Sequence, residues 1–381
     1  MTRSAPQLNI VADENIPALE HYFGGLGSIQ RLPGRPLCRA QLARADVLLV
    51  RSVTRVDEQL LQGTPVKFVG SCTIGTDHLD TDWLERNGIA WSAAPGANAN
   101  SVVEYVFCAL AALGCDWRER RFGIVGCGNV GGLLQRRLHR LGVQCAVYDP
   151  WLPDNPDSAP LERVLRQDVV CLHAPLVTGG PHPSRHLLGE RQLASLPDGA
   201  VLISAGRGAV VDNSALLGFL RGGGRVTTVL DVWEGEPAIN TALLELVDIG
   251  TPHIAGYSLD GKLAGTRMIR AAVGLALLGE GNSGQATSEE GQAHTIAVGP
   301  GAEKGGFGQL ADLLLQIYDP RSDDTRLRQA ARGALPMAQA FDLLRREYPQ
   351  RHEFHHYCID DARLDKAQRA QLAALGLYEA E

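Results

Sequence analysis

The chain has 381 residues, of which 45% are hydrophobic and 21% charged, as in a globular protein of two or three domains. A formal net charge of −7 at pH 7 argues against a nucleic acid or an anionic membrane surface as its partner. The sequence has no apolar stretch near the ~20 residues that span a membrane, so we expect a cytoplasmic protein. The eight cysteines form no CxxC pair, and several stand within apolar runs, which favours free thiols.

The first 95 residues alternate short apolar runs with polar, helix-like stretches. Buried parallel strands are predicted by the runs at 8–12, 47–50, 66–70 and 89–91. Helical patterns at 57–62 and 81–87 fall between them. These elements predict a small flavodoxin-like α/β unit, and this part of the sequence has no dinucleotide-binding fingerprint.

A second β/α series follows a long apolar helix predicted at 97–113. Six strands are predicted in it, at 122–125, 143–148, 169–173, 200–204, 226–230 and 247–250. About six parallel strands separated by helices complete a doubly wound sheet. The second series is therefore expected to form an α/β domain of its own.

The rest of the chain predicts a returning helix, a linker and a final module. A helix at 259–278 leads back to the first unit, and residues 279–306 are rich in Gly, Ser, Glu and Ala, which is typical of a linker. Helical patterns at 309–317, 338–346 and 366–375 and a strand pattern at 353–359 predict a small α+β module. The predicted domains are 1–95 with 257–290, 96–256, and 291–381.

A glycine-rich turn stands between the strand at 122–125 and the next helix. It reads GxGxxG, formed by Gly126, Gly128 and Gly131 with Asn129 and Val130 inside it. The first glycine permits a tight turn, the second lets the backbone approach a pyrophosphate, and the third allows close helix–strand packing. Asp149 stands 18 residues after Gly131, where an acid takes the ribose hydroxyls of NAD. The pattern predicts an NAD-binding Rossmann domain, with a glycine-rich turn of another α/β fold as the alternative.

Three side chains of catalytic type follow the ends of later strands. They are Arg207 in SAGRG, Glu236 in DVWEGEP and His253 in TPHIAG. Open parallel sheets bind their ligands at this edge. Removal of a hydride from a hydroxy acid needs a guanidinium for the carboxylate, a histidine for the hydroxyl proton and a carboxylate to orient that histidine. Each residue alone also fits a surface or loop role, but together they predict a hydride-transfer site.

These motifs resemble those of the D-isomer-specific 2-hydroxyacid dehydrogenases. The matching stretches are 126–131, 204–212 (SAGRGAVVD), 231–237 (DVWEGEP) and 251–256 (TPHIAG), within a resemblance that covers nearly all of residues 8–280. The resemblance implies that the catalytic set is Arg207, Glu236 and His253. It implies that the NAD site includes Ala205, Gly206, Asp231 and Gly256, and that the substrate contacts are Ser52, Thr73 and Tyr257.

The form HIAGYS at 253–258 and the extra C-terminal module resemble one branch of this family. The resemblance implies a small phosphorylated hydroxy acid as substrate and a homodimer held by the C-terminal module. Another 2-hydroxyacid dehydrogenase, such as one that uses phosphoglycerate, is the alternative within the family. A protein that senses NAD without turnover is the alternative outside it, and the intact catalytic trio argues against that reading.

The predicted substrate contacts of the first unit also have a physical basis. Ser52 and Thr73 lie just past the strands predicted at 47–50 and 66–70, so both hydroxyls are expected at one edge of the sheet. Arg51, beside Ser52, is our candidate for neutralising the substrate phosphate. Backbone N–H groups of 70–75 offer an anion-binding nest. The alternative for both hydroxyls is a local cap.

Two further patterns are interpreted as structural. The run RHEFHHYC at 351–358 fits no closed zinc pattern, and strand alternation divides its ligands between two faces, so no metal is expected. The arginine-rich stretch 321–332 is interpreted as a solvated helix face rather than a nucleic-acid patch. The alternatives are a role at a dimer interface and a contact with the active site of a partner subunit.

Overall fold

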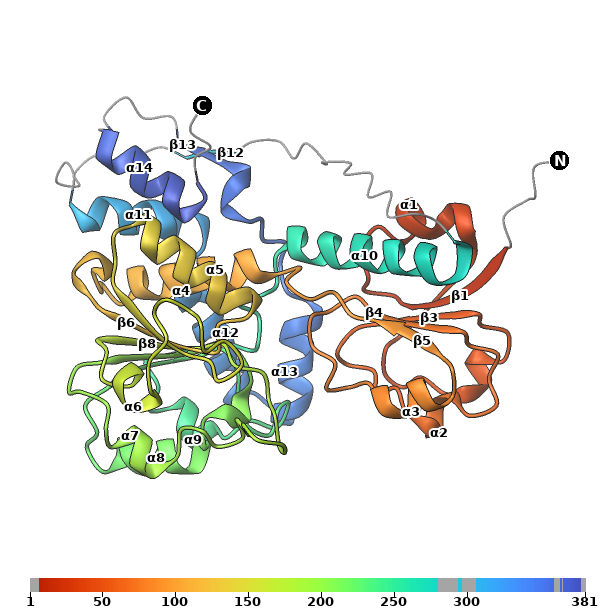
Figure 1. Ribbon diagram of the computed structural model, residues 1–381, viewed down its shortest axis with the longest axis horizontal. Coiled ribbons are helices and arrows are strands. Elements are labelled where there is room, and N and C mark those ends of the chain that lie inside the picture. Colours follow the sequence, from red (N-terminus) through yellow and green to blue (C-terminus); the bar gives the residue numbers. More distant parts are fainter. Residues whose placement is uncertain (1–6, 280–293, 297–305, 360–363, 365, 378–381) are drawn as a thin grey trace. The chain divides into compact units, whose positions relative to one another are not determined.

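The computed structural model describes residues 7–279, 294–296, 306–359, 364 and 366–377 (Figure 1). The chain divides into two compact units. Unit 1 is Met1–Asn98 with Ser258–Glu290, and unit 2 is Ala99–Tyr257 with Gly291–Glu381. The C-terminal segment thus belongs to the same compact unit as the glycine-rich turn, and its status as a separate domain stays a prediction. Most of the predicted linker lies outside the described residues.

Unit 1 contains a five-stranded parallel sheet in the order β2-β1-β3-β4-β5, which confirms the flavodoxin-like prediction. Its strands are β1 (Leu8–Asp13), β2 (Gly27–Leu32), β3 (Val47–Val50), β4 (Phe68–Ser71) and β5 (Ala90–Ser92). Its helices are α1 (Leu19–Phe23), α2 (Glu58–Leu61), α3 (Thr81–Arg86) and α10 (Leu259–Val273). Helix α10 packs closely on β4, because a Cβ at Gly70 would lie only 2.4 Å from Ile269 Cγ2.

Unit 2 contains a six-stranded parallel sheet in the order β11-β10-β9-β8-β6-β7. Its strands are β6 (Phe122–Val125), β7 (Cys145–Tyr148), β8 (Val169–Leu172), β9 (Val201–Ser204), β10 (Thr227–Leu230) and β11 (Ile249–Gly250). The helices that separate them are α5 (Asn129–Arg140), α6 (Leu161–Val164), α7 (Glu190–Leu193), α8 (Asn213–Arg221) and α9 (Thr241–Leu244), and α4 (Ala99–Ala112) precedes the sheet. This is the doubly wound Rossmann sheet that the sequence predicts.

One edge of the unit 2 sheet is shortened. A Rossmann sheet has a strand beyond its second one, but here that position is reduced to a single bridge between Val147 and Ser158. Polar side chains fasten the segment instead, because Gln135 Nε2 donates to Asn155 Oδ1 (2.8 Å) and Asp157 Oδ2 (2.6 Å). The connection from β7 back to β8 is therefore fixed by hydrogen bonds rather than by a full strand.

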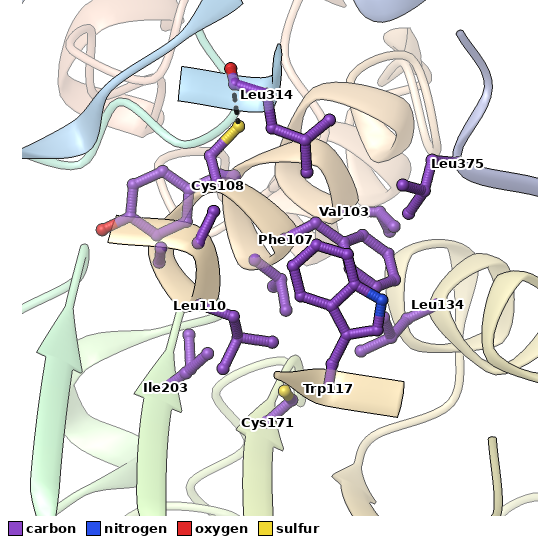
Figure 2. Close-up of a cluster of buried hydrophobic side chains, with 14 of the residues drawn as sticks. Val103, Phe107, Cys108, Leu110, Trp117, Leu134, Cys171, Ile203, Leu314 and Leu375 are labelled. Atoms are coloured by element: carbon purple, nitrogen blue, oxygen red, sulfur yellow. Dashed lines mark hydrogen bonds between the residues drawn. The ribbon is translucent and has the colours of Figure 1, made fainter. Parts of the chain in front are cut away.

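The C-terminal segment adds helices and a short strand pair to unit 2. Its elements are β12 (His294–Ile296), α11 (Phe307–Ile317), α12 (Pro320–Ala331), α13 (Met337–Arg346), β13 (Tyr357–Ile359) and α14 (Lys366–Leu375). Figure 2 shows Leu314 of α11 and Leu375 of α14 in one buried cluster with Phe107 of α4 and Trp117. Truncating a buried ring of this kind to alanine costs about 3–5 kcal/mol. This shared core is why the segment groups with the Rossmann sheet.

Helices α12 and α13 bury Leu327 and Phe341 in a second cluster with side chains of the Rossmann sheet. Arg328 on α12 donates to the carbonyl oxygens of Leu244 (2.6 Å) and Val247 (2.8 Å). The side chain of Arg328 is only 19% exposed. The interpretation of 321–332 as a solvated face is therefore wrong for Arg328, which satisfies carbonyls at the end of α9.

The structure bears on two of the expectations from composition. Every cysteine whose side chain is described is a free thiol. Among the described residues, no helix is both long and apolar enough to cross a membrane.

Candidate active site

The glycine-rich turn follows β6, and a side chain is sterically excluded at two of its three glycines. Gly126 has φ +84°, and a Cβ there would lie 2.5 Å from the backbone N of Ala174. A Cβ at Gly131 would lie 2.0 Å from the carbonyl O of Gly126. At Gly128, by contrast, a Cβ would meet nothing within 4 Å. The first and third glycines therefore allow the turn and the packing of α5, and the second leaves open space beside the backbone.

The open space lies where helix α5 begins. Gly128 is the cap residue and has no side chain to accept from the first N–H groups, which belong to Asn129 and Val130. Helix N-termini of this kind bind phosphate groups. Asp149 joins the turn from the end of β7, because its Oδ2 accepts from Cys127 N–H (2.8 Å) and its Oδ1 from Trp151 N–H (3.0 Å). The structure thus brings the predicted acid to the predicted phosphate turn.

The loop after β9 lies beside the loop after β8. A Cβ at Gly206 would lie 2.9 Å from Ala174 O and 3.0 Å from His173 Cα, so Ala205–Gly206 passes close to that backbone. Arg207 follows, is partly buried, and donates to Gly206 O (3.0 Å). His173 is a residue that the sequence analysis missed. Both of its ring nitrogens are buried with no hydrogen-bond partner among the described residues, and burial lowers its pKa to about 4.

The centre of the site is a short contact between His253 and Glu236. His253 Nδ1 lies 2.7 Å from Glu236 Oε2, and the other oxygen of Glu236 accepts from Trp233 N–H (2.7 Å). Burial acts to raise the pKa of Glu236, but the charge of His253 and these hydrogen bonds outweigh it and hold the pKa below its usual value. A charged carboxylate on Nδ1 fixes the tautomer that leaves Nε2 for a substrate. The histidine side chain is 32% exposed.

The loop that carries His253 is anchored by the buried carboxylate of Asp231. Asp231 is 1% exposed, and burial raises its pKa. Its carboxylate accepts from Ile254 N–H (2.8 Å), Ala255 N–H (3.0 Å) and the Thr251 hydroxyl (2.6 Å). Tyr105 of α4 extends this network, with its hydroxyl 2.8 Å from Thr251 Oγ1. The structure therefore shows Asp231 as the support of the loop Thr251–Gly256, and a contact between Asp231 and NAD stays a prediction.

The C-terminal segment also reaches this loop, which sequence reasoning did not foresee. Arg351 is 9% exposed and donates to Ala255 O (2.5 Å) and Ile254 O (3.4 Å). The ring of Tyr257 lies 5.7 Å from the ring of Tyr348 and 5.4 Å from Arg345 Cζ. No local motif marks these arginines, because about 100 residues separate them from the loop that they contact.

A second histidine–carboxylate contact lies near the first. His186 Nε2 is 2.7 Å from Glu234 Oε1, and His186 Nδ1 is 3.5 Å from Asp212 Oδ2. These three residues could hold a metal ion by their spacing, as could His139, Cys145 and Asp157. In both groups the histidine already has a carboxylate partner at 2.7 Å. The expectation of no metal stays a prediction.

The predicted contacts of unit 1 lie at the carboxyl ends of adjacent strands, because β3 pairs with β4. Ser52 is exposed just past β3. Thr73 is partly buried past β4, and its Oγ1 lies 2.9 Å from Ser71 Oγ, so its hydroxyl also has a local role. Burial raises the pKa of the Cys72 thiol to about 12, although the charge of Arg51 acts in the opposite direction. Arg51 thus places positive charge at this end of the sheet.

Comparison with known proteins agrees with this geometry. Residues 106–255 match the NAD-binding domain of the D-isomer-specific 2-hydroxyacid dehydrogenases, and 302–376 match a domain of unknown function, DUF3410. The D-lactate dehydrogenase of Aquifex aeolicus, solved with NAD and lactic acid, superposes with a TM-score of 0.61 at 21% identity, over 71% of this chain and 96% of that one. The NAD-bound 3-phosphoglycerate dehydrogenase of Entamoeba histolytica has a TM-score of 0.61 at 20% identity, over 70% and 94%. The fold and the family match define an NAD-dependent 2-hydroxyacid dehydrogenase, with NAD as its cofactor.

Sequence relatives narrow the class. The erythronate-4-phosphate dehydrogenase of Cellvibrio japonicus is 51% identical over 97% of this chain and 99% of its own length. Those of Teredinibacter turnerae and Pseudomonas aeruginosa PAO1 are 46% and 48% identical, over 97% and 91% of this chain and 98% and 93% of their own. The chain belongs to the D-isomer-specific 2-hydroxyacid dehydrogenase family, in the branch of the erythronate-4-phosphate dehydrogenases.

Proposed function

We propose that the chain oxidises the 2-hydroxyl of 4-phospho-D-erythronate to give 2-oxo-3-hydroxy-4-phosphobutanoate, a step of pyridoxal 5′-phosphate biosynthesis. The observation that carries the proposal is the 2.7 Å contact between His253 and Glu236, after strands of the same parallel sheet that carries the glycine-rich turn. The names of its relatives support the choice of substrate.

The chemistry assigns one task to each member of the trio. His253 Nε2 accepts the proton of the substrate hydroxyl, and Glu236 stabilises the imidazolium that forms. Arg207 holds the substrate carboxylate, since a guanidinium matches a carboxylate in two parallel hydrogen bonds. Bound NAD supplies the acceptor for the hydride that leaves C2.

The remaining contacts are proposed from position and resemblance. The cofactor contacts are Gly126, Gly128, Asn129, Val130, Gly131, Asp149, Ala205, Gly206, Asp231 and Gly256. The substrate contacts are Ser52, Thr73, Tyr257 and Arg51. The hydroxyl groups of Ser52, Thr73 and Tyr257 are assigned to the polar groups of the substrate, and Arg51 contributes positive charge for its phosphate.

The test is turnover by the purified protein with 4-phosphoerythronate, 3-phosphoglycerate and D-lactate in parallel. Formation of NADH and of the 2-oxo acid is measured separately, so that reduced cofactor retained on the enzyme is also detected. Selective oxidation of 4-phosphoerythronate is expected. Preference for another acid would keep the trio and reject the substrate. Binding of NAD without turnover of any acid would favour the sensor.

We further propose that the chain is a cytoplasmic homodimer joined through its C-terminal segment. The resemblance of that segment to the dimerising module of the branch supports the assembly. Sedimentation equilibrium should give twice the chain mass, and a monomer at micromolar concentration would reject the dimer.

A further inference from the structure

Arg345 stands on the helix of the C-terminal segment that faces the catalytic loop. It lies four residues after Phe341 on α13, so both side chains share one face of the helix. Phe341 is fully buried and fixes that face against the Rossmann core. Arg345 Cζ lies 5.9 Å from the ring centroid of Phe341 and 5.4 Å from that of Tyr257. The guanidinium is thus held beside the residue that ends the loop of His253.

One polar atom of Arg345 lacks a partner in the protein. Its Nε is buried with no hydrogen-bond partner among the described residues, although the side chain also hydrogen-bonds to Tyr257. The acidic side chain that acts most strongly on its charge is Glu236, whose two oxygens already accept from His253 and from Trp233 N–H. A buried N–H donor without an acceptor is costly, so this N–H favours an acceptor atom of a bound anion.

The charge of Arg345 is maintained despite this burial. Burial acts to lower its pKa, but Tyr257 and Glu236 outweigh that effect and raise the pKa above its usual value. The side chain therefore offers a permanent positive charge beside the catalytic pair. The rings of Tyr257 and Phe341, 5.4 and 5.9 Å from Arg345 Cζ, limit the freedom of the guanidinium, which favours two-point binding of an oxyanion.

We propose that Arg345 binds the phosphate group of the substrate, so that the C-terminal segment contributes a substrate-binding residue to the site of its own chain. The inference rests on the proposed function, because that function supplies a substrate with two anionic groups. Arg207 takes the carboxylate, and Arg345 takes the phosphate dianion. A planar guanidinium suits the phosphate better than a lysine, because it can donate to two oxygens at once.

The experiment compares Arg345→Met with Arg346→Met. Methionine keeps the unbranched apolar stem of the side chain and removes the charged guanidinium. Arg346 is the next residue on α13, is 60% exposed, and lies 3.6 Å from Glu347, so it is a matched control for the loss of one positive charge. The kcat and KM of both variants are measured with 4-phosphoerythronate and with D-erythronate, which lacks the phosphate. Thermal unfolding and NADH binding show whether each variant is folded.

Arg345→Met should raise the KM for 4-phosphoerythronate roughly 10- to 100-fold, the effect of losing charge-assisted hydrogen bonds. It should leave kcat/KM for D-erythronate nearly unchanged, and Arg345→Lys should recover part of the loss. Arg346→Met should behave as wild type. An equal loss of kcat/KM with both substrates would show that Arg345 only positions Tyr257. An unchanged kcat/KM with both substrates would show that Arg345 does not contact the substrate. Either result overturns the proposal.

Failure of the proposed function can be distinguished from failure of the proposed role of Arg345. If the wild-type protein does not oxidise 4-phosphoerythronate, the function is rejected, and calorimetric titration with inorganic phosphate then tests Arg345 directly. Weaker phosphate binding by Arg345→Met than by Arg346→Met would support the anion site. Equal binding by the two variants would reject it.

Discussion

The two histidine–carboxylate contacts of unit 2 have nearly the same geometry and different surroundings. Glu234 and Glu236 come from one turn after β10, and each lies 2.7 Å from a histidine. His186 has a carboxylate near both ring nitrogens, Glu234 and, at 3.5 Å, Asp212. His253 has one at Nδ1 alone, and its Nε2 has no partner among the described residues. A histidine with carboxylates on both sides is suited to joining loops, whereas one with a single carboxylate can still exchange a proton with a ligand.

Distance alone therefore does not identify a proton acceptor. The pair of His186 joins the loops of Asp212 and Glu234, and Asn213 Oδ1 adds a bond from Glu234 N–H at 3.1 Å. The pair of His253 sits on a loop anchored by buried Asp231, and the outer nitrogen points to no protein group that the structure describes. The first contact is therefore expected to stabilise the fold, and the second to serve the reaction.

The largest effect is expected from removing the imidazole of His253. His253→Asn should lower kcat by about 1,000-fold, within the range of general acid–base catalysis, while NAD binding is retained. His186→Asn is the matched variant and should keep kcat within about threefold while lowering the melting temperature. Steady-state kinetics with NADH fluorescence as the binding readout checks both variants. Similar losses of kcat in the two variants would show that the two histidines do not differ in their catalytic role.

His173 is a third histidine of unit 2, and neither of its ring nitrogens has a hydrogen-bond partner among the described residues. Burial lowers its pKa to about 4 from 6.5, so the unfolded chain binds a proton at a higher pH than the folded one does. Stability should therefore fall as the pH drops from about 6.5 to 4 and then level off. The expected loss is about 3 kcal/mol in the NAD-free protein.

Urea unfolding of wild type and His173→Phe between pH 7 and 4 measures this loss. The variant should lack that part of the pH dependence, and His182→Asn, which changes an exposed histidine, should retain it. The same slope in all three proteins would mean that the native state protonates His173 as readily as the unfolded chain does, which contradicts a lowered pKa.

A smaller catalytic effect is expected from Glu236→Gln, with Glu234→Gln as its counterpart. The pKa of Glu236 is lowered in the folded protein. The stability that its charge contributes is therefore fully present above the usual glutamate pKa of 4.5, and it is lost as the pH falls through the lowered pKa. Removal of the charge should cost about 30-fold in kcat and move the acid limb of kcat/KM to lower pH. Glu234→Gln should leave that limb in place. An unmoved limb in the Glu236 variant would contradict its role as partner of His253.

The smallest effect concerns the arginines of the C-terminal segment that hold backbone carbonyls. Arg351 donates to the carbonyls of Ile254 and Ala255, directly after His253, and Arg328 donates to those of Leu244 and Val247. Both Arg351→Met and Arg328→Met should lower stability by about 2 kcal/mol. Only Arg351→Met should also lower kcat, by about tenfold, since small displacements of a catalytic group are costly. Equal kcat values for the two variants would show that the loop of His253 does not depend on Arg351.

Much of the fold could be predicted because buried parallel strands read as apolar runs. Val169–Leu172 is VVCL and is fully buried, as are β6 and β9, whereas β7 and β10 are buried only in part. Strand β2 breaks the rule, because GSIQRL lies at the edge of its sheet and none of its residues is buried. The single bridge at Ser158 could not be predicted either, since the hydrogen bonds of Gln135 that replace a strand have no sequence pattern.

The residues of the site likewise divide into those that the sequence predicts and those that it does not. Arg207, Glu236 and His253 could be predicted because each follows a strand at the ligand-binding edge, and the structure joins two of them at 2.7 Å. His173 satisfies the same strand-end criterion and could have been found by it. Arg345 and Arg351 could not, because their importance arises from packing between segments that are distant in sequence. The sequence of α13 shows only an amphipathic helix, and nothing local says which of its arginines faces the loop.

The most direct test of the account follows the hydrogen at C2 of the substrate. 4-Phospho-D-erythronate carrying deuterium at C2 is incubated with the protein and NAD, and the reduced cofactor is analysed by mass spectrometry, with His253→Asn in parallel. If the hydride leaves C2 and His253 accepts the proton, the deuterium appears on the nicotinamide ring in a single turnover and the variant forms labelled cofactor far more slowly. Unlabelled reduced cofactor, or labelled cofactor formed equally fast by the variant, would contradict hydride transfer from C2 with His253 as the proton acceptor.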